Sequence, residues 1–288
     1  MSTPYIYQPA TGSLSHAEAV QWFREQGFDL VEGGIDNTSP AQVERILTTA
    51  EQCGWSWTPL NVNGADYKNY YQQAEYDGRY PGYYVGNRPE KTLEHFLCVQ
   101  LLQIQRQDVF VDLASEHSPL PEIVGRLMGC SSYSQDIMYP EGIHGYQIGG
   151  DACAMPVPAG FATKAALTCS LEHFESDADC RLFVELARVL APGGKVCVIP
   201  FYLYHEPAVQ TDPTYSAVHA VPFDPGARLF AAEGWGNRHG RFYSPRSFIE
   251  RIAEPVAEAF TFDYFWIRNA SELHPSNYVR FALVATRR

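Results

Sequence analysis

The sequence predicts an α/β fold built on a doubly wound, mostly parallel sheet, and three observations lead to it. Predicted strands and helices alternate from about residue 90 to residue 203, which is typical of a sheet covered by helices on both faces. Right-handed crossovers between such strands give the doubly wound arrangement. Near the C-terminus, TFDYFWIRN and YVRFALVATR are joined by ASELHPS, which predicts an antiparallel C-terminal hairpin that closes the sheet.

Two amphipathic helices are predicted before this sheet. Each begins at a serine, Ser15 in SHAEAVQWFREQG and Ser39 in SPAQVERILTTAEQCG, and each ends at a glycine. Neither helix could bury its apolar face alone, so we expect both to pack on the main domain. Residues 1–89 are therefore predicted to form an N-terminal helical cap and lid, and residues 90–288 the α/β domain.

Two aromatic segments flank the predicted α/β core. Residues 67–84, YKNYYQQAEYDGRYPGYY, are dense in tyrosine, and residues 204–245 form a long insertion rich in proline, glycine and aromatic residues. Connections of such length in a compact domain are usually functional or fold as a subdomain. One interpretation is that both segments cover the mouth of a ligand pocket. The alternative is that their rings simply pack on the core.

Five strands and their helices follow in order from residue 90. The strands are predicted in DVFVDLA, CSSYSQDIM, YQIGGDACAMPVP, TKAALTCSLEHF and GGKVCVIPFYL. Helices are predicted in RPEKTLEHFLCVQLLQIQ, LPEIVGRLMG and DADCRLFVELARVL, and after the insertion in SPRSFIERIAEPVAEAF. Ligands of open α/β sheets bind beyond the carboxyl ends of the strands, so a site is expected there.

Composition excludes several classes of partner. The formal net charge of −12, without a long basic run, argues against broad binding to nucleic acid or to an anionic membrane. No apolar run approaches the ~20 residues needed to span a bilayer. The first residues, MSTPYIYQPATGS, lack the charged and apolar regions of a secretory signal. The seven cysteines form no CxxC pair, which favours reduced thiols in a cytoplasmic protein.

Four stretches of the α/β region carry motifs at the strand ends. They are VFVDLAS, SQDIM, IGGDACAMPVP, and ALTCSLEHF followed by ELARVLAPGGKVCVI. In this order they resemble the class I S-adenosylmethionine-dependent methyltransferases, particularly the small-molecule type. The resemblance covers residues 90–203 well and the final hairpin weakly. It implies a Rossmann-like methyltransferase fold, S-adenosylmethionine as cofactor, and methyl transfer to a small-molecule substrate.

The resemblance implies a cofactor site at the carboxyl ends of the strands. The residues that it assigns to the cofactor are Asp112, Ala114, Ser115, Glu116, Asp136, Asp151, Ala152 and Ser170. Asp136 is expected to accept both ribose hydroxyls, and Asp151 the adenine amino hydrogens beside the small Ala152. Asp112 is expected either to organise the turn or to meet the cofactor's ammonium. The alternative for each acid is a helix cap or a solvated turn.

The turn after the first of these strands lacks the glycines that the family usually has there. Its letters after Leu113 are ASEHS. Glycines at such a turn permit positive φ and let the backbone approach the cofactor. We expect the turn to stay tight, with Ala114 and Ser115 in ordinary backbone conformations. Glu116 is then expected to pair with the cofactor's ammonium or to turn to solvent, since pointing at the cofactor's carboxylate would cause repulsion.

Residues beyond the fourth strand and in the aromatic segments are the predicted catalytic and substrate contacts. Glu172 and His173 follow the fourth strand, and His173 is a candidate general base because an unperturbed imidazole titrates near pH ~6.5. The alternative is a structural histidine at the strand edge. Tyr84, Arg238 and Arg241 are the predicted substrate contacts, since a guanidinium binds carboxylate or phosphate. The alternative is that the arginines pair with the protein's own acids.

Two other functions stay open for the same fold. One is a metal-assisted enzyme, but the spacing of the nitrogen and oxygen ligands near the strand ends matches no established motif, and no metal site is predicted. Those ligands are Glu116, His117, Glu172, His173, His205 and Glu206. The other function is a catalytically silent scaffold that binds a protein partner. The sequence indicates neither the methyl acceptor nor the oligomeric state.

Overall fold

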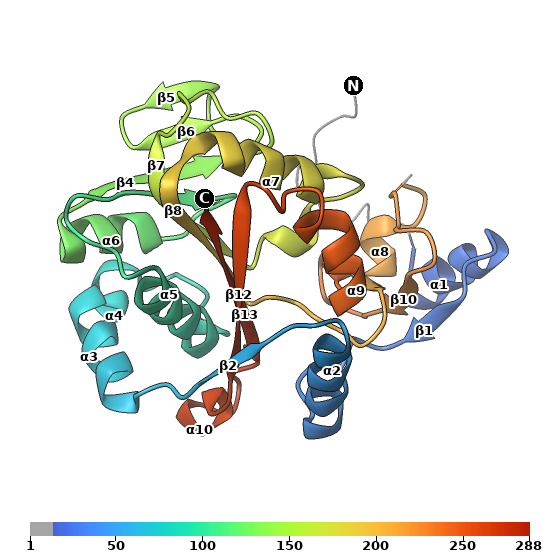
Figure 1. Ribbon diagram of the computed structural model, residues 1–288. Helices are drawn as coiled ribbons and strands as arrows, with labels where there is room; N and C mark the ends of the chain where they lie inside the picture. The colour runs from blue at the N-terminus through green and yellow to red at the C-terminus, as the bar shows by residue number, and fades with distance from the viewer. Residues whose placement is uncertain (1–13, 220) are drawn as a thin grey trace. The chain divides into compact units, whose positions relative to one another are not determined.

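A computed structural model describes residues 14–219 and 221–288 (Figure 1). The first residues, which are predicted not to form a secretory signal, lie outside the described residues. The chain divides into two compact units. The small-sheet unit contains the described residues up to Trp55, together with Leu171–Cys180 and Tyr202–Ile252. The large-sheet unit contains Ser56–Ser170, Arg181–Phe201 and Ala253–Arg288. Residues 56–89 of the predicted cap thus belong to the large-sheet unit, and a capping role stays a prediction.

The large sheet has nine strands in the order β2-β12-β13-β8-β7-β3-β4-β6-β5. Strand β13 runs antiparallel to both of its neighbours, β5 runs antiparallel to β6, and the other neighbouring pairs are parallel. The strands are β2 (Trp57–Leu60), β3 (Val109–Leu113), β4 (Ser131–Asp136), β5 (Gly142–His144), β6 (Gln147–Gly149), β7 (Ala162–Thr168), β8 (Leu190–Ile199), β12 (Phe260–Ile267) and β13 (Phe281–Arg287).

This order confirms the predicted fold class, a doubly wound and mostly parallel sheet. The antiparallel hairpin of β12 and β13 is present where TFDYFWIRN and YVRFALVATR predict it. From β3 the chain continues outward to β4 and β6, then returns to add β7 and β8 on the other side of β3. The topological switch point therefore lies between β3 and β7, and the crevice beyond their carboxyl ends is where such folds bind ligands.

Helices cover both faces of the large sheet (Figure 1). On one face α5 (Arg88–Leu102) and α6 (Leu120–Met128) share an apolar cluster with β3, β7, β8 and β13. Ile267 of β12 belongs to this cluster, whereas Phe260 and Phe262 contact Phe183 of α7 (Ala178–Val189). Since successive side chains of a strand point to opposite faces, α7 covers the other face.

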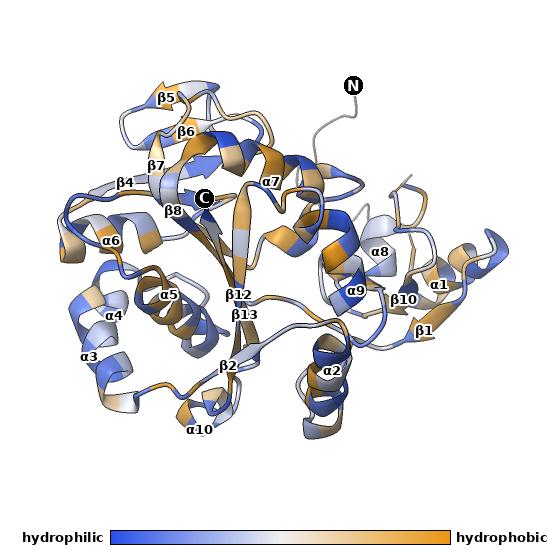
Figure 2. Ribbon diagram, in the orientation of Figure 1, coloured by the Kyte–Doolittle hydropathy of each residue, from blue (hydrophilic) through white to orange (hydrophobic). Residues whose placement is uncertain are grey.

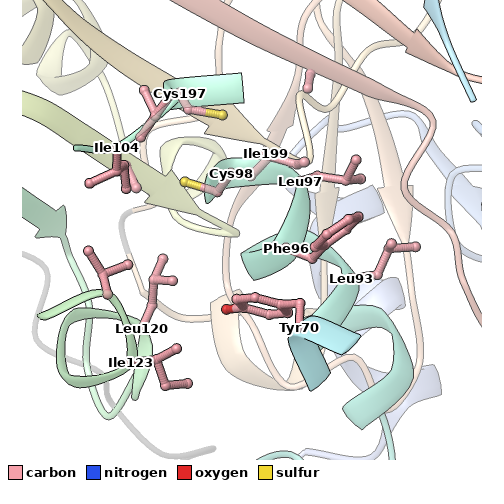
Figure 3. Packing of buried hydrophobic residues seen from close by; sticks show 14 of the residues in the cluster. Tyr70, Leu93, Phe96, Leu97, Cys98, Ile104, Leu120, Ile123, Cys197 and Ile199 are labelled. Carbon is pink, nitrogen blue, oxygen red and sulfur yellow. The ribbon is translucent and has the colours of Figure 1, made fainter. Parts of the chain in front are cut away.

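The core of the large-sheet unit centres on α5. Figure 3 shows Leu93, Phe96 and Leu97 of this helix packed with Tyr70 and Ile123 from neighbouring helices. Burying a side chain of this size contributes about 1.5–3 kcal/mol. In Figure 2, α5 carries mostly hydrophobic colours, whereas α3 (Gly64–Ala74) carries mostly hydrophilic ones. The remaining short helices of this unit are α4 (Tyr76–Arg79) and α10 (Ala270–Leu273).

The small-sheet unit has a four-stranded sheet that the sequence analysis did not predict. Its order is β1-β10-β9-β11, and only β11 is antiparallel among these described strands. The sheet was missed because Leu30 pairs with Leu229, about two hundred positions away. The elements are α1 (His16–Glu25), β1 (Leu30–Glu32), α2 (Pro40–Gln52), the 3-10 helix Leu171–His173, β9 (Ala208–Thr211), α8 (Pro213–Ser216), β10 (Arg228–Ala231), β11 (Gly240–Phe242) and α9 (Pro245–Phe248), followed by a π-helical turn (Ile249–Ala253).

Candidate functional site

The carboxyl ends of β3, β4 and β7 meet at one edge of the large sheet. Asp112 is the second-last residue of β3, Asp136 ends β4, and Ser170 follows β7. The Ser170 hydroxyl donates to the Leu113 carbonyl at 3.4 Å, which ties the ends of β7 and β3 together. Three of the predicted cofactor residues therefore lie at the switch point.

Asp112 is fully buried, and neither of its carboxylate oxygens has a hydrogen-bond partner among the described residues. Burial raises the pKa of this carboxyl to about 7, the nearby Ser118 hydroxyl lowers it, and the Asp136 carboxylate raises it. A buried carboxylate without a donor costs free energy in a folded chain. The position therefore suits a ligand that brings a cation or a hydrogen-bond donor.

The turn after β3 takes left-handed backbone conformations without glycine. Ala114 has φ of 48° and Glu116 has φ of 47°. The expectation that Ala114 stays in an ordinary region is therefore wrong, since this turn needs positive φ at the places where glycine is easiest to accommodate. A non-glycine residue held in this region typically costs about 1–3 kcal/mol, so the surroundings must fix the turn.

Strand β4 is what fixes the turn. The Ala114 N–H donates to the Gln135 side-chain oxygen at 3.2 Å, and the Ser115 N–H donates to the Gln135 carbonyl at 3.0 Å. The Glu116 N–H donates to the Asp136 carboxylate at 2.8 Å, and the Tyr139 hydroxyl donates to the Glu116 carbonyl at 2.7 Å. Three consecutive N–H groups of the turn are thus bound to β4 and point to it.

Asp151 lies two residues beyond β6, next to the buried Ala152. One oxygen of its carboxylate accepts the Cys153 N–H at 2.9 Å, and the other lies 3.8 Å from the Arg181 guanidinium. Its side chain is 45% exposed. The carboxylate therefore has room to accept further donors, and its predicted role toward adenine stays a prediction.

Glu116 is exposed and lines an open hollow of about 460 Å³ together with tyrosines of the aromatic segment. The lining residues are Tyr80, Gly82, Tyr83, Tyr84, Glu116, His117 and Pro119. Tyr84, the predicted substrate contact, is 48% exposed. The hollow brings Tyr84 and Glu116 to one surface, although 32 positions separate them in the sequence.

The tyrosine-rich segment packs partly on the core, and its role as a lid stays a prediction. Tyr70 and Tyr76 are buried in the core, and their hydroxyls lie 3.2 Å apart. The Tyr76 hydroxyl also contacts Nδ1 of the buried His95 at 2.8 Å, and Tyr83 contacts Nε2 of the same ring at 3.1 Å. The first half of the segment therefore packs on the core, whereas its last residues face the hollow.

Glu172 and His173, the predicted catalytic residues, belong to the small-sheet unit. His173 donates from Nδ1 to the His239 carbonyl at 2.6 Å, which leaves Nε2 as the basic nitrogen of the neutral ring. Its Nε2 lies 3.6 Å from the Glu172 carboxylate. This arrangement orients the imidazole, and its role as a general base stays a prediction.

Arg238 and Arg241, the predicted substrate contacts of the same unit, pair with the protein's own acids. Arg238 binds both oxygens of Glu175 at 2.6 and 2.8 Å. Arg241 is buried, binds Asp224 at 2.5 and 2.8 Å, and lies 3.2 Å from Asp179. These contacts are the alternative that the sequence left open, and a role of either arginine toward substrate stays a prediction.

Sequence reasoning missed several polar residues near the switch point. Gln135 and Tyr139 shape the turn after β3, but a glutamine inside a strand gives no signal by itself. Other missed residues are Glu90, Lys91, Glu94 and His95, all buried on α5. A signal for them existed, because Glu90 and Glu94 share the helix face of Leu93 and Leu97, which the apolar periodicity marks as buried.

Two kinds of feature are absent from the part of the chain that the structure describes. No group of three or more histidine, cysteine, aspartate or glutamate residues there is arranged to hold a metal ion. No helix within residues 14–219 and 221–288 combines the length and the apolar character needed to cross a lipid bilayer.

Comparisons with known proteins give likenesses to solved structures. No family model and no curated protein matches the chain. The 1,6-didemethyltoxoflavin-N1-methyltransferase of Burkholderia thailandensis, with bound 1,6-didemethyltoxoflavin and S-adenosylhomocysteine, is 13% identical over 81% of this chain and 93% of its own, with a TM-score of 0.48. The PH0226 protein of Pyrococcus horikoshii is 16% identical over 76% and 97%, with a TM-score of 0.46. A complex between the Haloferax volcanii Trm112 methyltransferase activator and a putative methyltransferase matches at 11% identity over 77% and 96%, with a TM-score of 0.44.

Proposed function

We propose that the large-sheet unit binds S-adenosylmethionine beyond β3, β4 and β6 and transfers its methyl group to a small molecule. The observation that carries this proposal is the fully buried Asp112 carboxylate at the switch point, whose oxygens have no hydrogen-bond partner within bonding geometry among the described residues, although the Ser118 hydroxyl lies nearby. A cationic ligand group would offset the cost of burying this charge. When bound, S-adenosylmethionine supplies a methyl group on a cationic sulfonium together with a free ammonium.

The neighbouring acids fit the rest of such a ligand. Both oxygens of Asp136 accept one backbone N–H each, from Glu116 and Met138, and each keeps a second lone pair for a ribose hydroxyl. Asp151 is half exposed beside the small Ala152, so it can accept the amino hydrogens of adenine. We propose Asp112 for the ammonium, Asp136 for the ribose and Asp151 for the base.

We propose that acidic side chains at the glycine-free turn contact the cofactor, in place of the backbone groups that a glycine loop would offer. The N–H groups of Ala114, Ser115 and Glu116 are bound to β4, so the turn does not direct them to a ligand. Glu116 is exposed at the same edge and can reach an ammonium or remain in solvent. Recognition of the amino-acid end therefore rests on the acids, with Asp112 buried and Glu116 exposed.

The acceptor is proposed to be a small molecule bound in the hollow beside Tyr84. A volume of about 460 Å³ falls within the range of roughly 300–1,000 Å³ that small-ligand pockets occupy. In methyl transfer the protein mainly orients the acceptor and excludes water, which can lower the barrier by about 7–11 kcal/mol. Tyr84 and Tyr83 offer aromatic faces for that orientation.

Calorimetric titration with S-adenosylmethionine and S-adenosylhomocysteine tests the proposal. The natural chain should bind both, and Asp112→Asn should weaken both at least about tenfold, because it removes the charge that faces the ammonium. Asp263→Asn is the matched control, since Asp263 is exposed on β12 and should bind as the natural chain does. Release of S-adenosylhomocysteine is then followed while small hydroxyl and amine compounds are offered as acceptors.

Two outcomes would contradict the proposal. A folded natural chain that binds neither nucleoside would favour the silent scaffold. Equal affinity of the Asp112→Asn variant would remove Asp112 from the site, whatever the cofactor.

A further inference from the structure

Helix α5 carries four titratable side chains into the core of the large-sheet unit. Glu90, Glu94 and His95 are fully buried, and Lys91 is 7% exposed. Both oxygens of Glu94 lie 3.3 Å from the Lys91 ammonium. Burying an ion pair is usually no more stabilising than packing apolar side chains of the same size. Stability alone therefore does not account for this pair.

Cys169 joins the pair from the end of β7. Its thiol donates to Oε1 of Glu94 at 3.2 Å, and the same carboxylate accepts from the Lys91 ammonium. The Tyr278 hydroxyl lies 3.9 Å from the same sulfur. Burial lowers the pKa of Lys91, but the neighbouring Cys169 sulfur and the Glu94 carboxylate raise it well above its usual range. The sulfur thus shares a buried site with a permanent cation.

The backbone at Cys169 is held in a conformation that side chains rarely adopt. Its φ is 49°, while its N–H still donates to the Ile199 carbonyl at 3.0 Å as the strand ends. Such conformations cost about 1–3 kcal/mol and cluster at functional sites. The turn places the thiol at the switch point, one residue before Ser170, and leaves Cys169 partly exposed.

Other cysteines of the chain lie in different surroundings. Cys98 and Cys197 are fully buried in the apolar cluster, where Figure 3 shows them facing each other. The hydrogen bond with Cys197 and burial raise the pKa of the Cys98 thiol well above its usual range. Burial and Asp179 raise the pKa of the Cys180 thiol to about 11, although Arg251 and Arg241 lower it. Cys169 thus lies beside a buried ion pair, whereas Cys98 and Cys197 lie among apolar side chains.

The Lys91 side chain also lies near a residue that lines the hollow. The Lys91 ammonium lies 5.4 Å from the centre of the Tyr84 ring, and Tyr84 lines the hollow. Burial raises the pKa of the Tyr84 hydroxyl, Lys91 lowers it, and the nearby Glu116, Cys169 and Glu94 raise it further. Lys91 is thus near both the Cys169 site and a ring that lines the hollow.

We infer that Cys169 is an activated nucleophile, held against the Lys91 ammonium, that takes a soft carbon electrophile entering from the hollow. The S–H proton passes along its hydrogen bond to the Glu94 carboxylate. The sulfur lone pair forms a bond to the electrophilic carbon, and the leaving group departs with its electron pair. Lys91 and Glu94 are positioning residues, because they act on the sulfur and not on the electrophile. The inference does not depend on methyl transfer.

Alkylation of the intact chain by iodoacetamide tests the inference, with the rate at each cysteine followed by peptide mass spectrometry across pH. Iodide is the leaving group. Cys169 should react at least about tenfold faster near pH ~7 than Cys153, a partly exposed cysteine of the same unit, because a neighbouring lysine lowers a thiol pKa from about 8.5. Its pH midpoint should lie correspondingly below that of Cys153.

Two variants move the midpoint in opposite directions, which a structural role would not do. Lys91→Met should raise the midpoint at Cys169 by about one unit or more, and Lys91→Arg should largely restore it. Glu94→Gln should lower the midpoint, because it removes a negative charge beside the sulfur. If Lys91→Met does not fold, Lys91→Arg and Glu94→Gln still decide. Reaction of Cys169 at the rate of Cys153, or an unmoved midpoint in folded variants, would overturn the inference.

Discussion

The backbone N–H of Glu116 donates to the Asp136 carboxylate at 2.8 Å, so the end of β4 holds the turn after β3 in its left-handed form. The other oxygen of that carboxylate accepts the Met138 N–H at 2.9 Å. Asp136 therefore has a structural role beside its proposed role toward the ribose. The two roles can be separated by measuring stability and affinity on the same variants.

Asp136→Ala should reduce both quantities. The free energy of unfolding should fall by about 1–3 kcal/mol, because two backbone donors lose their acceptor. Affinity for S-adenosylhomocysteine should fall at least several-fold. Asp136→Asn keeps one acceptor oxygen and should fall between. Urea unfolding and calorimetry check the pair, and unchanged affinity would remove Asp136 from the cofactor site.

Glu116→Gly tests how the glycine-free turn recognises the cofactor. Glycine adopts positive φ without strain, so the turn should keep its shape. The free energy of unfolding of the variant should fall by no more than about 1 kcal/mol. Affinity for S-adenosylmethionine should stay similar or weaken, since an exposed carboxylate near the ammonium is lost. The opposite outcome is that the natural chain does not bind S-adenosylmethionine, whereas the Glu116→Gly variant binds it strongly. That result would make Glu116 a blocking residue and would end the proposal of methyl transfer for the natural chain.

Asp112 should make stability depend on pH. Its pKa is raised to about 7, whereas an unfolded aspartate titrates near ~3.9, so the folded chain holds the proton more tightly. The contribution to stability is full below the unfolded pKa and is lost as pH rises through about 7. As pH rises from the unfolded pKa to the folded pKa of Asp112, the natural chain should lose stability relative to Asp112→Asn. The difference in the free energy of unfolding should change by at most roughly 4 kcal/mol. Urea titrations at several pH values, with Asp263→Asn as control, measure this; parallel curves would contradict it.

Arg241 is expected to stabilise the small-sheet unit. It is buried between Asp224 and Asp179, and the Tyr243 hydroxyl donates to Asp179 at 2.7 Å. Arg241→Met leaves both acids without this cation and should lower the free energy of unfolding by about 3–5 kcal/mol. Arg246→Met is the control, because the ion pair of Arg246 with Glu250 is exposed and should contribute less than about 1 kcal/mol to the free energy of unfolding. A stable Arg241→Met variant with a raised KM for acceptor would instead support the predicted substrate contact.

The parts predicted correctly from the sequence are those that depend on local pattern. The strand that ends at Asp136 and helix α6 are predicted by the spacing of apolar residues within a few positions of the sequence. The small sheet depends on the pairing of Leu30 with Leu229, for which no local signal exists. The positive φ of Ala114 could not be read from its residue type, because the hydrogen bonds that the N–H groups of Ala114 and Ser115 donate to Gln135 impose it. Site residues at strand ends are thus predictable, whereas the contacts that shape them are not.

The tyrosine-rich segment should respond to ligand only in its last residues. Its buried half is fixed by Tyr70, Tyr76 and the ring of His95, whose pKa burial and Lys91 lower to about 3, so the ring stays neutral and contacts both Tyr76 and Tyr83. Amide hydrogens of residues 67–76 should therefore exchange slowly with or without ligand.

Residues 80–86 are the part that borders the hollow, and their exchange should slow when S-adenosylhomocysteine or an acceptor binds. Residues 226–243, predicted with them to cover a pocket, are followed in the same experiment. Tyr76→Phe serves as the comparison: it removes the hydroxyl that contacts His95, so exchange in the helical half should rise while the ligand effect on residues 80–86 persists. Exchange that no nucleoside and no acceptor alters would leave packing on the core as the role of the whole segment, because a surface that closes over a ligand cannot keep its amide hydrogens equally open to water in both states.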